Sequence, residues 1–499
     1  MVSEAETGPV LIEAPAPAGW QRSIASVGLI LAAALQAVDV LIANVALPQL
    51  QQDLGGGISL GAWVIASYLC AAAVMAPLTG WLRRRYGARR LFPAAVGVFA
   101  VASLLCALAP SAGTLILFRL LQGAGGGVIH PLAQAILLDI YPSQRHGRIM
   151  AILGAGLMVG PILGPPLGGF ITDIASWRWV FLINLPLGLL SIGCVWRLRP
   201  TVETARDPTI DVVGILLLVA GVAASQLLLQ RGIEQSWFHS PEIIAEAAIT
   251  VAAFTLLAVR ARGTGFTAFR LAIFKDVNFV AAAFYNFMLS ALLFVTLVFV
   301  PSLVQGPLGF PATTAGAIIV PRAILLMIVM LLVGRLIGKV PHRILLGAGW
   351  GLMSAGLFIL SELPPDHALA WIIIGSSIQA IGAGMLYIPL VTLAFSTLVP
   401  EIRTDAAGLY SLLRQIAYAS GVALASALLQ SKIATHLAGL PAGDIAGPGQ
   451  SQLAADATLS AYAECFRLMA ITAAAIIPGI WFFRTGSGRA GAGSLWPTG

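Results

Sequence analysis

One acidic residue, Asp39, lies inside an apolar stretch that runs from position 24 to position 47. A carboxylate in a segment long enough to cross a membrane costs roughly 2.5–3.5 kcal/mol, so such residues are retained mainly where they have a function. We therefore interpret Asp39 as a proton carrier. A structural role, as a hydrogen-bonding group in the first span, is the alternative.

A basic residue, Arg119, lies in another long apolar stretch, at 112–138. Each charge is costly alone in a membrane, so both should face the protein interior or a wet cavity. An arginine favours the ionised form of a nearby carboxylate, and burial favours the neutral form. Movement of Arg119, or of a cationic substrate, could therefore switch the proton affinity of Asp39. The alternative is that Arg119 only tethers neighbouring helices.

Polar residues accompany both charges. Gln36 lies three positions from Asp39 and Gln122 lies three positions from Arg119, so each pair shares a helix face. Together with Asn44, these amides either line a cavity or bond across helices, and the sequence leaves both open. Weaker cavity candidates come from the second half of the chain: Asn286, Arg322 and Tyr387.

Residue types that serve enzymes are not arranged for catalysis here. The sequence has no phosphate-binding Gly-Lys-Ser/Thr loop, which argues against ATP-driven pumping, and no cluster with metal-ligand spacing. The 4 cysteines lie far apart in apolar segments and are interpreted as small buried hydrophobic residues. His130, beside Pro131, is interpreted as a packing or hydrogen-bonding residue rather than a second proton site. We expect no enzyme activity, metal or cofactor.

Composition defines the class of protein that positions these residues. Of 499 residues 58% are hydrophobic and 10% are charged, with a mean hydropathy of +0.91, which no soluble domain of this length shows. A span needs about 20 apolar residues. Fourteen stretches qualify: 24–47, 60–80, 91–110, 112–138, 149–172, 179–197, 210–229, 243–260, 278–303, 313–334, 344–361, 368–397, 406–431 and 465–483.

The basic residues predict how these spans are oriented. Most of the 28 Lys and Arg residues fall in the tails and loops on one side, especially in the arginine loop at 83–90. Positive charge marks cytoplasmic loops, so both termini should be cytoplasmic. The net charge of +7 reflects this distribution rather than nucleic-acid binding. Asp139, Glu401 and Asp405, at cytoplasmic span ends, are expected to be solvated.

The chain also repeats itself weakly. GWLRRRYGARR at 80–90 is echoed by GRLIGKVPHR at 334–343, which suggests two related halves. The predicted organisation is a disordered cytoplasmic tail, a six-helix half, two extra linking helices, a second six-helix half and a cytoplasmic tail, at 1–21, 22–205, 206–270, 271–486 and 487–499. The Gly- and Ala-rich stretch at 433–463 is predicted to be a flexible outside loop.

The arginine loop carries the first resemblance. Gly80, Arg84, Gly87 and Arg89 belong to a Gly-x-Leu-x-x-Arg-x-Gly-x-Arg-Arg pattern after the second span, which resembles that of the major facilitator superfamily. The family usually has an acidic residue where this chain has Arg84, so the family's carboxylate-based latch between helices is in question here. The drug-exporter branch tolerates a basic residue at this position.

A glycine- and proline-rich helix carries the second resemblance. Such residues kink a membrane helix and let a neighbour approach closely, so generic small-residue packing is one interpretation. GAGLMVGPILGPPLGG at 154–169 also resembles the antiporter motif of major facilitator exporters, which is scarce in importers. The matching residues are Gly160, Pro161, Gly164, Pro165, Gly168 and Gly169.

Further motifs narrow the resemblance to one branch. VDVLIANVALP (38–48), FRLLQGAGGG (118–127), WRWVFLINLPLG (177–188), VPRAILLMIVMLLVGRL (320–336) and the Arg-Gln pair at 414–415 are similar to the fourteen-span drug:proton antiporters of the EmrB/QacA type. The resemblance covers about 24 to 484. It implies an all-α major facilitator fold, with two six-helix halves plus an extra central helix pair, and proton coupling through Asp39 and Arg119.

The resemblance also implies a function and a setting. The protein would export small amphipathic or lipophilic compounds across the bacterial inner membrane by alternating access, driven by the proton gradient without a cofactor. Its partners would be the lipid bilayer, protons, a small-molecule substrate and, as in relatives from double-membraned bacteria, a periplasmic adaptor and an outer-membrane channel. The alternatives are a dedicated exporter of one metabolite or siderophore, and a non-transporting sensor or assembly component.

Overall fold

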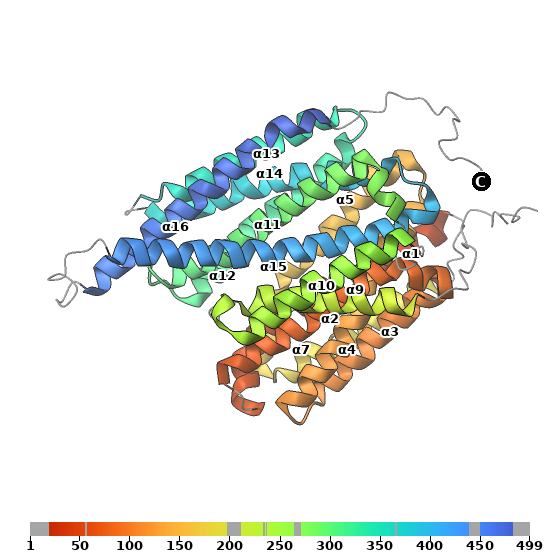
Figure 1. Ribbon diagram of the computed structural model, residues 1–499, viewed down its shortest axis with the longest axis horizontal. Helices are drawn as coiled ribbons and strands as arrows, with labels where there is room; N and C mark the ends of the chain where they lie inside the picture. Colours follow the sequence, from red (N-terminus) through yellow and green to blue (C-terminus); the bar gives the residue numbers. More distant parts are fainter. Residues whose placement is uncertain are drawn as a thin grey trace, which may run out of the picture.

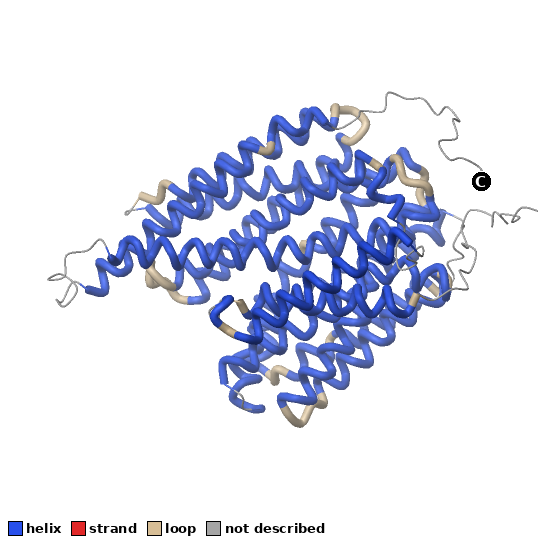
Figure 2. The backbone as a smooth tube through the Cα atoms, in the orientation of Figure 1, coloured by secondary structure: helices blue, strands red, loops and turns tan. Residues whose placement is uncertain are grey.

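Long helices account for almost all of the chain that can be described. The computed structural model describes residues 19–54, 57–196, 211–232, 235, 237–263, 271–364, 367–438 and 450–482. Figures 1 and 2 show these helices running in similar directions through the molecule. They are α1 (Gly19–Leu54), α2 (Gly57–Tyr86), α3 (Ala88–Ala107), α4 (Ala112–Ile140), α5 (His146–Leu157), α6 (Val159–Ile174), α7 (Arg178–Leu182), α8 (Asn184–Val195), α9 (Val212–Arg231), α10 (Pro241–Gly263), α11 (Val277–Gln305), α12 (Ala312–Leu336), α13 (His342–Ser361), α14 (Ala368–Ser396), α15 (Pro400–Ala438) and α16 (Gln450–Ala475).

These helices form fourteen segments that are long and apolar enough to cross a membrane. One such segment includes α5 and the start of α6, and another includes α7 and α8. The number of spans predicted from hydropathy is confirmed for the part of the chain that the structure describes, and the protein is a multi-pass membrane protein.

The break between α5 and α6 follows from the glycine- and proline-rich sequence. Met158 separates the two helices, and Pro161 in the first turn of α6 has no N–H to continue the ladder of α5. Gly160 lies against α1, where a Cβ would come within 2.6 Å of the carbonyl oxygen of Ala37. Only glycine allows α6 to approach α1 this closely.

The helices form two groups, and an additional pair of helices lies between them. In the first group α2 and α3 pack on α4, and α1 packs on α6 and α8. In the second group α13 packs on α14 and α16, and α11 packs on α15. The pair α9 and α10 pack on each other, and α9 also contacts α2 and α15, one helix from each group (Figure 1).

One predicted loop is largely helical. We expected a flexible loop over 433–463, but α15 continues to Ala438 and α16 begins at Gln450, so the prediction is wrong outside 439–449, which lies beyond the described residues. Glu464 on α16 pairs with Lys432 at 2.6 Å and with His436 at 3.1 Å. These contacts bind the end of α15 to α16 and extend both helices past the predicted span ends.

Candidate functional site

Asp39 and Arg119 form a buried ion pair. They lie on α1 and α4, with side chains 0% and 1% exposed, and Arg119 Nη1 lies 2.8 Å from Asp39 Oδ2. Two charges withdrawn from solvent carry a desolvation cost of several kcal/mol each unless their geometry is good and their other hydrogen-bonding groups are satisfied. The network around the pair meets that condition.

Three polar residues complete the network around this ion pair. Gln122 Nε2 and Asn184 Nδ2 donate to Asp39 Oδ1 at 2.9 and 2.6 Å, and Arg119 Nη1 donates to Gln122 Oε1 at 2.8 Å. Both amide groups also donate to Ser103 Oγ, which itself donates to the carbonyl oxygen of Phe181. We call Asp39, Ser103, Arg119, Gln122 and Asn184 the charge network. It joins α1, α3, α4 and α8.

Aromatic rings enclose the arginine. The Arg119 Cζ atom lies 4.5 Å from the centroid of the Tyr68 ring and 5.7 Å from that of Phe181. Cation–π contacts of this kind are worth about 0.5–2 kcal/mol each. Tyr68 also lines the neighbouring cavity, so its ring is shared between the charge network and that space.

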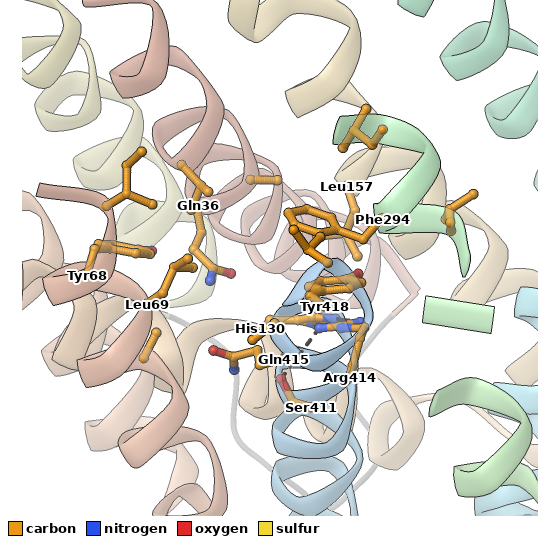
Figure 3. Close-up of a pocket in the computed structure, with 18 of the residues that line it drawn as sticks. Gln36, Tyr68, Leu69, His130, Leu157, Phe294, Ser411, Arg414, Gln415 and Tyr418 are labelled. Carbon is orange, nitrogen blue, oxygen red and sulfur yellow. Dashed lines mark hydrogen bonds between the residues drawn. The ribbon is translucent and has the colours of Figure 1, made fainter. Parts of the chain in front are cut away.

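The cavity lies between the two groups of helices and has a volume of about 620 Å³. Its wall includes residues of α1, α2, α4, α5, α9, α11, α12, α14 and α15, so α9 of the extra pair contributes to it. Figure 3 shows Gln36, Tyr68 and Leu69 on one side, facing a group formed by His130, Arg414 and Tyr418.

The structure places the predicted polar residues in three environments. Gln36, Arg322 and Tyr387 line the cavity. Gln122 belongs to the charge network, and Asn286 is buried on α11, 1% exposed, without contributing to the described cavity wall. The side chain of Asn44 lies outside the described part of the structure.

Arg414 was not predicted as a cavity residue, yet it connects the two halves across the cavity wall. Its Nη1 lies 3.3 Å from His130 Nε2 and donates to the Tyr387 hydroxyl at 3.2 Å. An arginine can only donate, so His130 Nε2 must accept and the imidazole is neutral in this arrangement. His130 therefore makes a hydrogen bond across the halves.

The arginine loop joins the halves at one end of the molecule. Arg84 Nη1 on α2 donates to both carboxylate oxygens of Asp405 on α15, and Arg83 bonds Thr404 Oγ1 at 2.5 Å and Asp139 Oδ2 at 2.6 Å. Gly80 lies directly against Asp405, and a Cβ there would collide with the carboxylate. The Arg84–Asp405 contact, which we call the latch, thus places a cation on α2 and a carboxylate on α15.

The latch corrects one prediction. Asp139 and Asp405 were expected to be solvated, but their side chains are only 3% and 0% exposed, because the arginines of α2 cover them. Gly87 lies between α2 and α3 and Arg89 is exposed on α3, away from these pairs. At this end α5 and α12 also meet, whereas Trp63 and Arg231 line the cavity near the opposite helix ends. This conformation is therefore closed at the arginine loop.

The matched glycines and prolines lie together on α6. Gly160 contacts α1, and Gly168 accepts a bond from Thr172 Oγ1 through its carbonyl oxygen at 2.8 Å. Gly164 is buried, and the burial of the remaining matches, Pro161, Pro165 and Gly169, lies outside the described part of the structure. The helix thus supports α1 beside the cavity residue Ala37, two positions before Asp39.

A multi-pass helical protein with two helix groups, a central cavity and a sealed ion pair beside it has the architecture of a secondary transporter. The sequence comparison gives the family. The chain belongs to the Major Facilitator Superfamily, whose model matches residues 29–422. The predicted fold class and family are confirmed, and members of this family are transporters, not enzymes.

Similar bacterial proteins carry names that refer to multidrug export or to fatty acid resistance. The chain is 34% identical over 408 residues to the fatty acid resistance protein FarB of Neisseria gonorrhoeae, covering 81% of this chain and 80% of that protein. It is 32% identical over 421 residues to the multidrug export protein EmrB of Haemophilus influenzae, covering 84% and 82%. The human organic anion transporter MFSD10 has a similar fold, with a TM-score of 0.60, 15% identity, and coverage of 92% and 100%.

Proposed function

We propose that this protein is a proton-coupled antiporter that exports small amphipathic or lipophilic compounds. The names of its relatives, multidrug export and fatty acid resistance, support export. The observation that carries the coupling proposal is the sealed Asp39–Arg119 pair beside the cavity. A membrane-embedded carboxylate is costly to keep. Here its partner Arg119 contacts the ring of Tyr68, which also lines the cavity that a substrate would occupy.

The chemistry of coupling follows from the contacts of the pair. Ionised Asp39 accepts hydrogen bonds from Arg119, Gln122 and Asn184. A proton on Asp39 removes its charge, so Arg119 loses its counter-ion while keeping its contact with the Tyr68 ring. Rearrangement of Arg119 and Tyr68 then reaches the cavity wall directly. Proton binding to Asp39, through Arg119, and substrate binding in the cavity would therefore both act on the side chain of Tyr68.

Alternating access would move the halves at 22–205 and 271–486 against each other, with the linking pair at 206–270 contributing α9 to the cavity wall. The conformation described here would be one end state, closed at the arginine loop. Opening that end requires the latch to separate. Gly160 and its neighbours on α6 would keep α1 and α6 moving as one body.

The proposed setting is the bacterial inner membrane with both termini in the cytoplasm. The concentration of arginines at the closed end supports this orientation, because positive loops remain on the cytoplasmic side. An adaptor and an outer-membrane channel as partners, and the proton gradient as energy source, are part of the same proposal. They rest on the resemblance to the EmrB/QacA branch.

The variant Asp39→Asn tests the coupling role. Asn preserves shape and hydrogen bonding but cannot ionise, so we expect a folded protein that still binds substrate and no longer exchanges it for protons. The measurement is substrate-induced proton flux in proteoliposomes at matched protein amounts. Asp53→Asn is the control, because Asp53 lies on the same helix but is 52% exposed. Exchange at the wild-type rate in Asp39→Asn would show that Asp39 is not the coupling acid.

A further inference from the structure

Arg322 is a buried cation in the cavity wall without a carboxylate partner. It follows Pro321 on α12, is 5% exposed and donates from Nη2 to the carbonyl oxygen of Leu293 at 3.0 Å. Within the described residues it makes no ion pair. A guanidinium carries five N–H donors and stays charged in proteins, so most of its hydrogen-bonding capacity remains available to whatever occupies the cavity.

Arg414 is the second such cation. Its hydrogen-bond partners are His130, Tyr387 and the Ser411 hydroxyl at 3.5 Å, and all three are neutral. These bonds, at 3.2 to 3.5 Å, lie at or beyond the long end of the usual range, and both hydroxyl groups can rotate to make other contacts. A carboxylate would accept from Arg414 more strongly than any of these groups, because charge-assisted bonds are about twice as strong as neutral ones.

The remaining charges near the cavity do not balance these arginines. Arg231 at the cavity edge is already paired with Glu242 at 2.8 Å and Glu246 at 3.2 Å, and Asp39 is committed to Arg119. Among the described residues of the cavity wall there is no Asp or Glu. Unpaired charges in a membrane interior are expensive, so this cavity favours the entry of an anion and disfavours that of a cation.

The rest of the wall suits an apolar body. Leu69, Leu157 and Leu297 line it, and the rings of Phe294 and Tyr418 stack there with centroids 4.6 Å apart. A volume of about 620 Å³ is within the range that holds one drug-sized molecule. A ligand that uses both features has one anionic group and an apolar, preferably aromatic, body.

We propose that the cavity binds amphipathic organic monoanions, carboxylates or sulfonates, with Arg322 and Arg414 supplying the positive charge. This substrate class rests on the proposed export function and defines what is exported. Arg322 is a specificity-determining residue in this proposal. Lipophilic cations of the same size are poor ligands.

A ligand series with a constant body tests the proposal on wild-type protein. The probes are 2-naphthoate, 2-naphthylmethylammonium and 2-naphthalenemethanol, which differ mainly in charge. Equilibrium binding is measured by calorimetry in nanodiscs of phosphatidylcholine, with empty nanodiscs subtracted to remove partitioning into lipid. We expect naphthoate to bind at least about tenfold more tightly than the other two probes, because each charge-assisted bond is worth 1.5–3 kcal/mol. Equal or tighter binding of the ammonium compound overturns the proposal.

Charge-removing variants locate the site. Arg322→Gln and Arg414→Gln should each weaken naphthoate binding roughly ten- to a hundredfold while leaving naphthalenemethanol unchanged. Arg322→Lys, which keeps the charge, should recover part of the loss. The control is Arg467→Gln, since Arg467 is 52% exposed and pairs with Glu362. Unchanged naphthoate affinity in both Gln variants, confirmed as monodisperse by size exclusion, would refute the assignment.

Transport separates this inference from the function on which it rests. If naphthoate binds as expected but no probe is exchanged for protons in proteoliposomes, the anion site stands and the export proposal falls. If the ammonium probe is exported, with a rate unaffected by the arginine variants, the export proposal stands and the anion site falls.

Discussion

The latch between Arg84 and Asp405 offers a direct test of how the two halves are held closed. Both side chains are almost fully buried, 5% and 0% exposed, and they lie on helices of different halves. In a conformation open at this end the two would separate into water. The variant Arg84→Met keeps an unbranched apolar side chain in place of the arginine stem and removes the guanidinium with its charge and hydrogen bonds.

The expected free-energy change follows from the burial of the Arg84–Asp405 pair. Breaking a buried ion pair by removing one partner costs about 3–5 kcal/mol, because the remaining charge is left in a poorly solvated place. Asp405 has further interactions, so the lower value applies. A loss of about 3 kcal/mol changes the closed-to-open ratio by roughly a hundredfold, since 1.4 kcal/mol corresponds to a factor of ten. A conformation that is 99% closed would then become about equally populated with the open one.

The assay is the distance between spin labels at the closed end. Tyr86 on α2 and Val399 before α15 are 54% and 43% exposed, so labels there should not disturb the latch. In a background with the four native cysteines replaced, we expect one short distance in the parent protein and a second, longer distance in Arg84→Met. Adding Asp405→Asn removes the carboxylate that Arg84→Met leaves unpaired by Arg84, and it should restore part of the population with the short distance.

The control and the refutation are both clear. Arg178→Met disrupts an exposed pair with Asp53, with side chains 41% and 52% exposed, which is worth at most about 1 kcal/mol. It should leave the distance distribution unchanged. If Arg84→Met also leaves the distance distribution unchanged, the ion pair does not hold this end closed. The same conclusion follows if the free energy of opening changes in the double variant by the sum of the changes in Arg84→Met and Asp405→Asn, because additive changes show that the two side chains do not interact.

Three further predictions address the helix packing, the charge network and the orientation. Gly160→Leu should insert normally but lose transport, because the new side chain would meet the backbone of α1. The control is Gly193→Leu, at a glycine with open space around it, which should transport normally. Equal efflux by both well-expressed variants would contradict this reasoning. Tyr68→Phe should retain coupling because the ring over Arg119 is kept, whereas Tyr68→Ala should expose the ion pair to the cavity and allow proton flux without substrate in a pH-sensitive dye assay; tight coupling in the Ala variant would argue against a separating role. A reporter fused after Arg484 should be active only in the cytoplasm, and activity only outside would reverse the proposed orientation.

The fold could be predicted from the sequence because the membrane restricts the possibilities. Every span must form its backbone hydrogen bonds within its own helix and be about 20 residues long, so apolar stretches of the sequence correspond to helices with few errors. The exception at the end of α15 comes from a contact with another part of the chain. The chain at 433–463 has a loop-like composition, and only the distant partner Glu464 explains why α15 continues past Lys432.

The charge network could be predicted only in part. Asp39 and Arg119 were recognisable because an isolated charge in an apolar segment needs an explanation. Ser103 was missed, and Asn184 was noted only as part of the motif at 177–188, since nothing in the chain order shows that α3 and α8 meet α1 there. The same limit explains the error at Asp405: its position at a span end suggested water, while its true neighbour, Arg84, lies far away in sequence.

The unbalanced arginines of the cavity also determine the electrical character of transport. If one proton enters for each monoanion that leaves, two positive charges effectively move inward per cycle. Each charge contributes about 2.3 kcal/mol per 100 mV, so the membrane potential alone would supply about 4.6 kcal/mol per 100 mV. Exchange of a proton for a monovalent cation would move no net charge and would respond only to the concentration gradients. Because Arg322 and Arg414 select the sign of the ligand, they also determine whether the transporter generates a current.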